Sequence, residues 1–194
     1  MNDEKKSGEE SQGALMEKML EARTVVISGG VNSDLAQKVT QQLLLLDHLD
    51  STKPITMVIN SPGGEVFSGF SIYDMVSFIN APVIGVVSGL AASMGSIIAL
   101  APPKGQRYAL PNAKFLIHQP LMMGYQGRAS DLEIQATEIL RDRARIVKLY
   151  ANNTGKSEEQ VAKDIELDNW MTALEAKEYG LVDHIITNRS EIKA

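Results

Sequence analysis

A strand-like unit recurs along this chain at nearly constant spacing. Three apolar runs each begin near a proline, at Pro54, Pro82 and Pro111, and these prolines lie 28 and 29 residues apart. The first two runs lead into a glycine-rich or small-residue turn and then into a helix-like segment. Strands made of continuous Val and Ile runs are usually buried on both faces, as in parallel sheets. The repeat therefore predicts an α/β fold with a parallel sheet and right-handed crossovers.

Further elements flank the repeated units. Residues 14–23 have the apolar spacing of a short amphipathic helix, "TVVIS" is typical of a strand, and "LVDHII" is typical of a closing strand. Ser157 with Gln160, and Thr172 with Glu175, predict the starts of two short helices, because each pair fits the capping-box pattern.

A long helix is predicted between these segments. Ser130 with Glu133 fits a capping box at its start, and Gly155 is a favourable stop. About 24 helical residues would span about 36 Å, more than a small domain needs, so we expect the helix to project from the body. Its apolar positions then need a cover, most simply another subunit. These positions are Leu132, Ile139, Leu140, Ile146 and Leu149.

Length and composition limit the class of protein. The 194 residues suit one domain at 14–194, preceded by a flexible segment at 1–13. This segment is polar and lacks the pattern of a secretion signal, which favours a cytoplasmic protein. With no cysteine, thiol chemistry and disulfides are excluded. The net charge of −5, without a basic cluster, argues against nucleic acid as the main partner.

Metal and membrane classes are also disfavoured. No two of the three histidines have the spacing of paired ligands on one helix, so we expect no metal site. The 29 uncharged residues between Asp74 and Lys104 are long enough to span a bilayer. However, Asn80-Ala81-Pro82 and the Gly and Ser residues that follow divide this stretch into a strand-like and a helix-like half. A buried strand and helix explain it better than a membrane span.

Ser93 is a candidate nucleophile. It stands in "GLAASMGS", directly after the apolar run "PVIGVVS". A serine at a sharp strand-to-helix turn can attack a carbonyl, because free amides at the helix start stabilise a developing oxyanion. The stretch is a relaxed form of the G-x-S-x-G pattern, with Ala91 in place of the first glycine. The alternative is a small-residue turn at which a helix merely packs tightly against a sheet.

Other candidate groups follow strands of the same repeat. His118 ends the next strand, which places it near Ser93 as a base, although it could be a buried histidine bonded to a backbone carbonyl. The segment "NSPGGEV" at 60–66 offers uncovered N–H groups for an oxyanion hole, or forms only a tight turn. An orienting carboxylate is also needed. Asp168 is plausible because a partly buried acid beside an aromatic residue, here Trp170, usually has a partner.

Several motifs occur in one order along the chain. They are "INSPGGEVFSGFSIYD", "GLAASMGS", "IHQP", "GYQG", "EILRDRARIVKLYANNTG" and "EAKEYGLVD". Together they resemble ClpP, the proteolytic-subunit family of the bacterial ATP-dependent Clp protease, from about Leu15 to Asp183. The resemblance implies a crotonase-like α/β fold, in which residues from about 121 to 154 form a protruding handle.

The resemblance also implies site residues and partners. Carried over by motif, Ser93 is the nucleophile, His118 the base and Asp168 the orienting acid of a Ser-His-Asp triad. The amides of Gly64 and Met94 fall at the oxyanion hole. The family implies two stacked heptameric rings, fed with unfolded chains by a partner AAA+ ATPase of the ClpX, ClpA or ClpC type. ATP belongs to that partner, because this chain has no nucleotide loop, and no cofactor is expected.

Three departures from the family pattern favour a divergent paralogue. The polar "NDEKKSGEESQG" replaces the usual pore-loop segment. Thr56 and Val58 stand where aromatic residues commonly line the ATPase-docking pocket, although Phe78 is retained. Leu167 stands before Asp168, where an arginine usually reaches across the ring-to-ring contact. These changes suggest a mixed barrel with a second ClpP-type subunit.

The predicted function is a serine endopeptidase subunit of a compartmentalised, ATP-dependent protease that degrades unfolded proteins to small peptides. Two alternatives stay open. One is a structural ring subunit whose triad is present but misaligned. The other is a crotonase-type enzyme that acts on CoA thioesters, which would share the fold and the glycine-rich turn.

Overall fold

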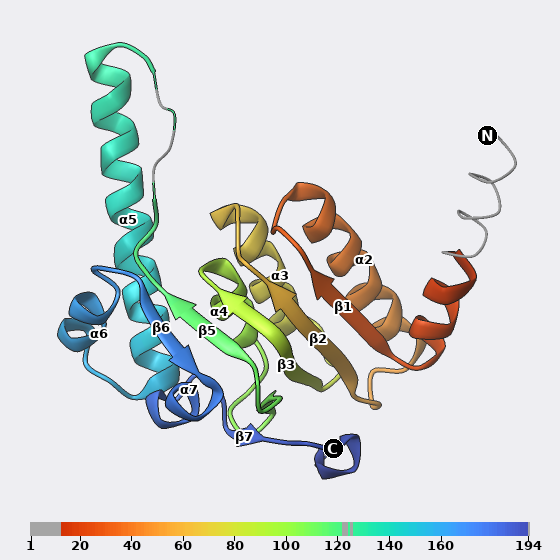
Figure 1. Cartoon of the computed structure of the whole chain (residues 1–194). Coiled ribbons are helices and arrows are strands. Elements are labelled where there is room, and N and C mark those ends of the chain that lie inside the picture. Colours follow the sequence, from red (N-terminus) through yellow and green to blue (C-terminus); the bar gives the residue numbers. More distant parts are fainter. Residues whose placement is uncertain (1–12, 122–123, 125, 194) are drawn as a thin grey trace, which may run out of the picture.

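A computed structural model describes residues 13–121, 124 and 126–193. Figure 1 shows a twisted sheet with helices packed behind its strands and one long helix, α5, projecting from the body. Residues 13–21 are helical and precede the first strand. The other elements are β1 (Thr24–Ser28), α2 (Ser33–Leu49), β2 (Ile55–Ser61), α3 (Val66–Phe78), β3 (Val83–Ala92), α4 (Met94–Ala99), β4 (Arg107–Ala109), β5 (Lys114–Ile117), α5 (Ala129–Thr154), α6 (Glu158–Asp164), β6 (Asn169–Thr172), α7 (Ala173–Tyr179), β7 (His184–Ile185) and a 3₁₀ turn (Arg189–Glu191).

The sheet confirms the predicted α/β class. Strands β1, β2, β3, β4 and β7 lie side by side in that order, and every pair is parallel. β3 changes partner along its length: Gly85–Val87 pair with β4, whereas Leu90–Ala92 pair with β5. β6 then pairs antiparallel with β5. β4 and β6 were not predicted, because neither short strand stands in an apolar run like those of the predicted strands.

Burial differs between the strands, and this corrects the expectation that all of them are covered on both faces. Val25 and Ile27 of β1 have no exposed surface, but Val26 between them is 46% exposed. β2 alternates in the same way, and only the first half of β3 is buried throughout. Helices therefore cover one face of β1 and β2, and the central strand is enclosed.

The long helix α5 differs from the prediction at its start. It begins at Ala129 rather than after Ser130, because Asp131 accepts a hydrogen bond from the Arg128 amide and pairs with the Arg128 guanidinium. The predicted stop at Gly155 is confirmed, with φ of 78°. The predicted starts of α6 at Ser157 and of α7 at Thr172 are also confirmed, the latter as a capping box.

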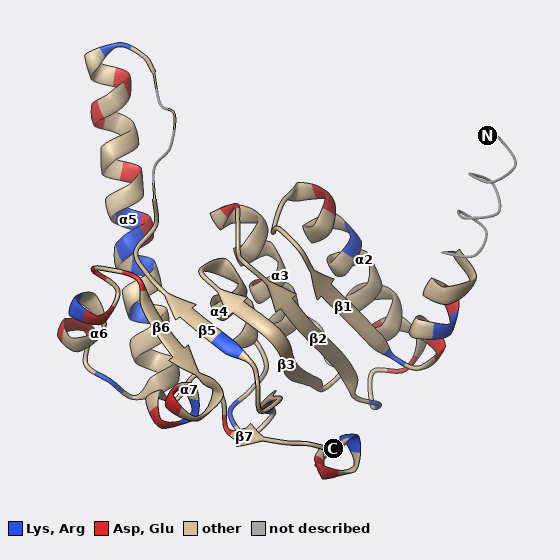
Figure 2. Ribbon diagram, viewed as in Figure 1, with Lys and Arg blue, Asp and Glu red and all other residues tan. Residues whose placement is uncertain are grey.

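The two halves of α5 have different surroundings. Its C-terminal half packs into the core, so Ile146, at 3% exposed, needs no cover from another subunit, contrary to the prediction. Leu132 and Leu140 on the projecting half are 39% and 64% exposed, as expected. Acidic residues predominate on the projecting half, and Arg and Lys residues gather next to the body (Figure 2).

Three further expectations concern the closing strand, the uncharged stretch from 75 to 103 and the N-terminal segment. The closing strand is confirmed but short, since β7 has two residues. The uncharged stretch divides into a strand, β3, and a helix, α4, as predicted. No helix in the described part of the chain is both long and apolar enough to cross a membrane. The predicted flexible segment lies outside the described residues, apart from Gly13, which is helical.

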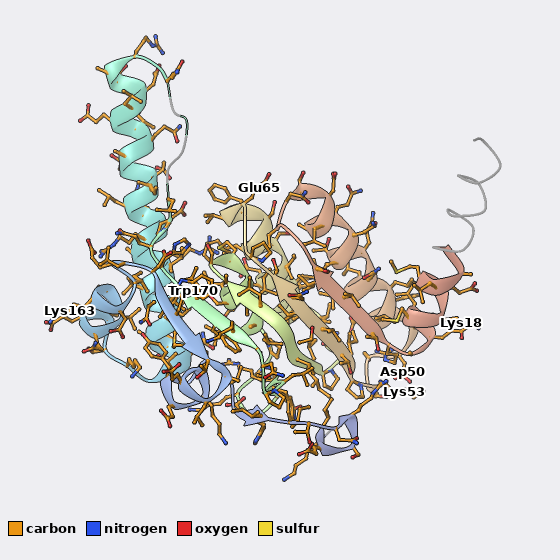
Figure 3. The ribbon with its side chains drawn as sticks, viewed as in Figure 1. Lys18, Asp50, Lys53, Glu65, Lys163 and Trp170 are labelled. Carbon is orange, nitrogen blue, oxygen red and sulfur yellow. The ribbon has the colours of Figure 1, made fainter. Side chains whose placement is uncertain are left out.

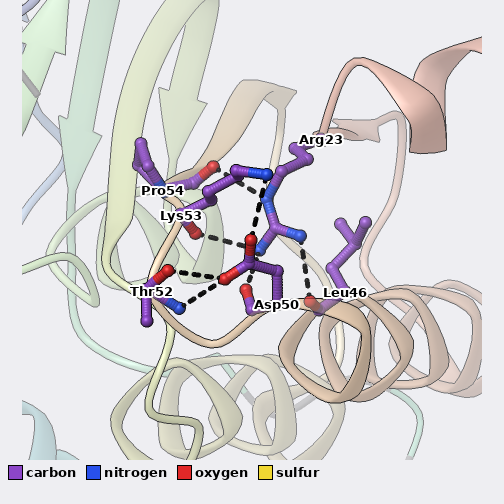
Figure 4. Close-up of polar contacts among 6 residues, drawn as sticks. All are labelled: Arg23, Leu46, Asp50, Thr52, Lys53 and Pro54. Atoms are coloured by element: carbon purple, nitrogen blue, oxygen red, sulfur yellow. Dashed lines mark hydrogen bonds and ion pairs between the residues drawn. The ribbon is translucent and has the colours of Figure 1, made fainter.

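Arg23 joins the first strand to the turn after α2 (Figure 4). Its φ is 48°, and its guanidinium donates hydrogen bonds to the carbonyl oxygens of Leu46, Asp50, Lys53 and Pro54 at 2.9–3.2 Å. Two of these carbonyls belong to the end of α2: Asp50 is its C-cap, and the Leu46 carbonyl also accepts a hydrogen bond from the Asp50 amide at 3.2 Å. The Thr52 side chain, and then Lys53, hold the pKa of the Asp50 carboxyl well below its usual range.

Arg23→Ala is expected to lower the free energy of unfolding by about 2–3 kcal/mol, because four carbonyl acceptors lose a charged donor at once. Urea denaturation followed by circular dichroism measures the change. Lys53→Ala is the control, since Lys53 makes only an exposed ion pair with Asp50. An equal effect of both substitutions would contradict the structural role assigned to Arg23.

Candidate active site

Ser93 occupies the sharp turn between β3 and α4. The strand continues through "GLAA" to Ala92, beyond the predicted apolar run, and α4 starts at Met94. Ser93 itself has φ of 55° and ψ of −124°, a conformation that residues other than glycine rarely adopt. Its amide donates a hydrogen bond to the Leu116 carbonyl of β5 at 2.9 Å. This geometry is that of a nucleophile elbow.

Close packing also explains the small residues around Ser93, in agreement with the interpretation that a helix packs tightly against the sheet here. A Cβ on Gly95 would lie 2.7 Å from the Ser61 carbonyl oxygen, and a Cβ on Gly69 would lie 2.3 Å from the Met94 methyl carbon. α4 is thus held tightly between β2 and α3. Tight packing and a strained turn are both needed to hold the hydroxyl at the strand end.

Ser93→Gly is expected to stabilise the protein by about 1 kcal/mol relative to Ser93→Ala, because only glycine adopts this backbone conformation without strain. Both substitutions remove the hydroxyl, so the difference between them isolates the backbone. Urea denaturation of the two variants measures it. A glycine variant no more stable than the alanine variant would show that the turn is unstrained.

Strand pairing brings His118 and Asp168 together. β5 lies beside the second half of β3, so His118 emerges one residue beyond the strand, near Ser93. β6 runs antiparallel to β5 with Ile117 opposite Asn169, which sets Asp168 opposite His118. The His118 Nδ1 to Asp168 Oδ1 distance is 3.1 Å.

The surroundings of Asp168 differ from expectation. The Asp168 side chain is 62% exposed, not partly buried beside Trp170, which is itself 54% exposed. The His118 side chain is 16% exposed.

Within the described part of the chain, no hydrogen bond joins the Ser93 hydroxyl to His118. Such contacts are often loose in unliganded sites and tighten when substrate binds.

Arg143 of α5 ties the segment after His118 to the loop before Asp168. Gln119 donates from its amide to the Ile165 carbonyl at 2.7 Å and from its side chain to the Glu166 carbonyl at 2.9 Å. Arg143 donates to the Gln119 side-chain oxygen at 3.2 Å and to the Glu166 carboxylate at 3.0 Å. No sequence pattern predicted this network, although Gln119 directly follows the candidate base and Glu166 stands two residues before the candidate acid.

The glycine turn after β2 faces the elbow. A Cβ on Gly63 would lie 2.7 Å from the Ser93 Cβ and 2.8 Å from the Met94 nitrogen. Gly64 has φ of 152°, and its neighbours Gly63 and Glu65 bond to Val31. Among the described residues, neither the Gly64 amide nor the Met94 amide donates a hydrogen bond to the protein. Both are therefore free to bind an oxygen atom in front of Ser93.

A cavity of about 450 Å³ contains these groups. Ser93, His118 and Gly64 lie in its wall, and its remaining surface is mainly apolar. Tyr150 of α5 also lines it and shares a 2.6 Å hydrogen bond with Ser96, which donates to the Ser93 carbonyl. Burial raises the pKa of the Tyr150 phenol, so it stays protonated. The apolar lining residues are Pro62, Val66, Met94, Ile97, Leu116, Pro120, Leu121 and Ile146.

A strained serine at a strand end, a histidine in contact with a carboxylate, and two free amides beside the serine form an arrangement that is typical of serine hydrolases. The comparisons agree with this class. The family model for Clp protease matches residues 7–189, and the chain belongs to that family. Its fold is the α/β fold of ClpP, as predicted from the motifs.

Individual relatives are similar over nearly the whole chain. The chain is 46% identical over 191 residues to the ATP-dependent Clp protease proteolytic subunit 2 of Treponema denticola, covering 98% of this chain and 95% of that protein. It is 47% identical to the ATP-dependent Clp protease proteolytic subunit of Ligilactobacillus salivarius, over 91% of this chain and 89% of that protein. A solved structure of a ClpP1 mutant from Listeria monocytogenes has a TM-score of 0.84 at 45% identity, covering 92% and 99% of the two chains.

Proposed function

We propose that this chain is a catalytically competent serine endopeptidase subunit of an ATP-dependent Clp protease, with Ser93, His118 and Asp168 as its triad. The 3.1 Å contact between Asp168 and His118, which lines the cavity together with the strained Ser93, carries the proposal. Each group flanks a different strand: Ser93 follows β3, His118 follows β5 and Asp168 precedes β6. Strand pairing brings the three side chains close together, and packing of the core does not require the Asp168 carboxylate, because it is 62% exposed.

The proposed chemistry is acyl transfer. Asp168 accepts a hydrogen bond from Nδ1–H of His118, which leaves Nε2 free to take the proton of the Ser93 hydroxyl. The Ser93 Oγ attacks the peptide carbonyl carbon, and the amides of Gly64 and Met94 bind the resulting oxyanion. His118 returns the proton to the leaving amine, and water then hydrolyses the acyl-enzyme by the same steps. No cofactor enters this scheme.

The assembly we propose is two stacked heptameric rings around a chamber. The projecting half of α5 supports it, because Leu132, Ile134 and Leu140 are 39–64% exposed and an apolar helix face needs a cover. Unfolded chains would be supplied by a AAA+ ATPase of the ClpX, ClpA or ClpC type, which also consumes the ATP. We propose a cytoplasmic location, with neither nucleic acid nor a membrane as partner.

The docking surface for that ATPase departs from the family pattern. Thr56 and Val58 line a cavity of about 180 Å³ on the exposed face of β2, and Phe78, although 74% exposed, is not among its lining residues. Leu167 is 80% exposed and has no charge to offer across a ring-to-ring contact. Both features support a mixed barrel with a second ClpP-type subunit. Size exclusion and pull-down would contradict it if this chain alone formed an active tetradecamer that binds its ATPase.

Labelling with a fluorophosphonate probe tests the catalytic proposal directly. We expect one adduct by intact mass on the wild-type chain and none on Ser93→Ala. Ser88→Ala is the matched control, since Ser88 is an exposed serine on the same strand and should leave labelling unchanged. An adduct that survives Ser93→Ala would overturn the assignment of the nucleophile.

The second candidate is a structural ring subunit with a silent site. The missing hydrogen bond between Ser93 and His118 in the described structure favours it. In that case the wild-type chain would take up no probe, alone or with its partner subunit, and Ser93→Ala would leave the activity of a mixed complex unchanged. Labelling that appears only with the partner would instead show that assembly completes the triad.

A further inference from the structure

We infer that Glu65 makes this cavity selective for peptides with a basic side chain close to the apolar residue at the cleaved bond, an inference that rests on the function proposed above. Glu65 lies between the Gly63-Gly64 turn and α3, and its side chain lines the same cavity as Ser93 and His118. Figure 3 shows Glu65 near the end of β2, at the start of α3.

The Glu65 carboxylate is the one acidic group among the described residues that line the cavity. Ser68 donates a hydrogen bond to its Oε2 at 2.7 Å, which fixes the side chain one turn into α3. In the described part of the chain, no Lys or Arg forms an ion pair with Glu65. The cavity therefore presents a fixed negative charge without a counter-ion, close to the candidate nucleophile.

The rest of the cavity selects for an apolar group. Met94, Ile97 and Ile146 are at most 3% exposed and form its inner surface. A peptide bound in extended form advances about 3.3 Å per residue, so a side chain one or two positions from the apolar one comes within reach of Glu65. A lysine or arginine there meets an opposite charge, whereas an aspartate or glutamate is repelled.

The expected selectivity is modest, because Glu65 is exposed to solvent. Ion pairs between exposed groups shift equilibria by about two- to fivefold. The preference should also shrink between low and high salt, because the ions screen the interaction. These two features distinguish a charge effect from a change in the shape of the cavity.

Binding to a chain that cannot form an acyl-enzyme tests the inference independently of catalysis. Two fluorescent peptides share one apolar residue, flanked on both sides by Lys in one and by Glu in the other. Anisotropy on Ser93→Ala should show the Lys peptide binding two- to fivefold more tightly. Adding Glu65→Gln should bring the ratio close to one, and Glu65→Lys should reverse it.

Glu158→Gln on the Ser93→Ala background is the matched control, since Glu158 is an exposed acid at the start of α6 that does not line the cavity. It should leave the ratio unchanged. Equal binding of the two peptides, no binding of either, or a ratio insensitive to Glu65→Gln would overturn the inference. Probe labelling of the chain with Ser93 intact is measured separately. A silent site would then appear as a loss of labelling, whereas an unselective cavity would appear as equal binding of the two peptides with labelling retained.

Discussion

Gly63→Ala should abolish probe labelling and lower the free energy of unfolding by more than about 3 kcal/mol. The new Cβ would lie 2.6 Å from the Ala92 carbonyl oxygen, 2.7 Å from the Ser93 Cβ and 2.8 Å from the Met94 nitrogen. Two of these are backbone atoms that cannot rotate away. The elbow must therefore move, and with it the hydroxyl and the Met94 amide.

Gly105→Ala is the matched control for this substitution. Gly105 has φ of 92°, against 89° at Gly63, but a Cβ there would meet no atom within 4 Å. Gly105→Ala should lower the free energy of unfolding by only about 1 kcal/mol, from backbone strain, and Ser93 should still be fully labelled by the probe. Urea denaturation and intact mass give both readouts. Similar losses for the two variants would show that backbone strain, and not contact with the elbow, explains the effect.

Asp168→Asn should lower kcat for peptide hydrolysis by about 10³- to 10⁴-fold while leaving the fold intact. An asparagine side chain can hold His118 in the wrong tautomer, and it cannot stabilise the imidazolium that forms during the reaction. The exposed position of Asp168 makes a large change in stability unexpected. Steady-state kinetics on a short fluorogenic peptide, with thermal denaturation alongside, measures the two effects.

Glu166→Gln provides the comparison for that prediction. Glu166 lies two residues earlier in the same loop, and its side chain is also 62% exposed, but its partner is Arg143. Its loss should reduce kcat less than tenfold, because the Gln119 bonds to the backbone of this loop remain. If both substitutions lowered kcat equally, the order of the loop rather than the Asp168 charge would control the rate.

The repeated strand units were predictable because each is long, apolar and bounded by turn residues. The spacing of Pro54 and Pro82 locates β2 and β3 to within a residue at their starts. The start of α5 was not predictable in the same way. Ser130 fits a capping pattern, yet an Arg128–Asp131 pair two residues earlier competes with it and sets the boundary.

Within the candidate site, too, the positions of some residues were predictable from the sequence and the position of another was not. Neighbouring parallel strands end at one edge of a sheet, so topology alone predicts that His118 lies near Ser93, and the cavity contains both. The position of Asp168 depends on the antiparallel pairing of β6 with β5, which no periodicity signals. From the residues alone Asp168 was one plausible acid beside Trp170, and the family resemblance then singled it out; the catalytic roles of all three residues stay predictions.

The connectivity of the sheet has a consequence for how this chain folds. Its parallel pairs join residues far apart in sequence: Ile55 meets Val83, 28 positions later, and Tyr108 meets His184, 76 positions later. To form such non-local pairs, the chain must lose the entropy of closing a long loop before it gains the energy of the contacts. We therefore expect folding in milliseconds to seconds rather than in microseconds. During synthesis, β1 to β3 can assemble first, whereas β4 gains its outer neighbour only when the last ten or so residues emerge.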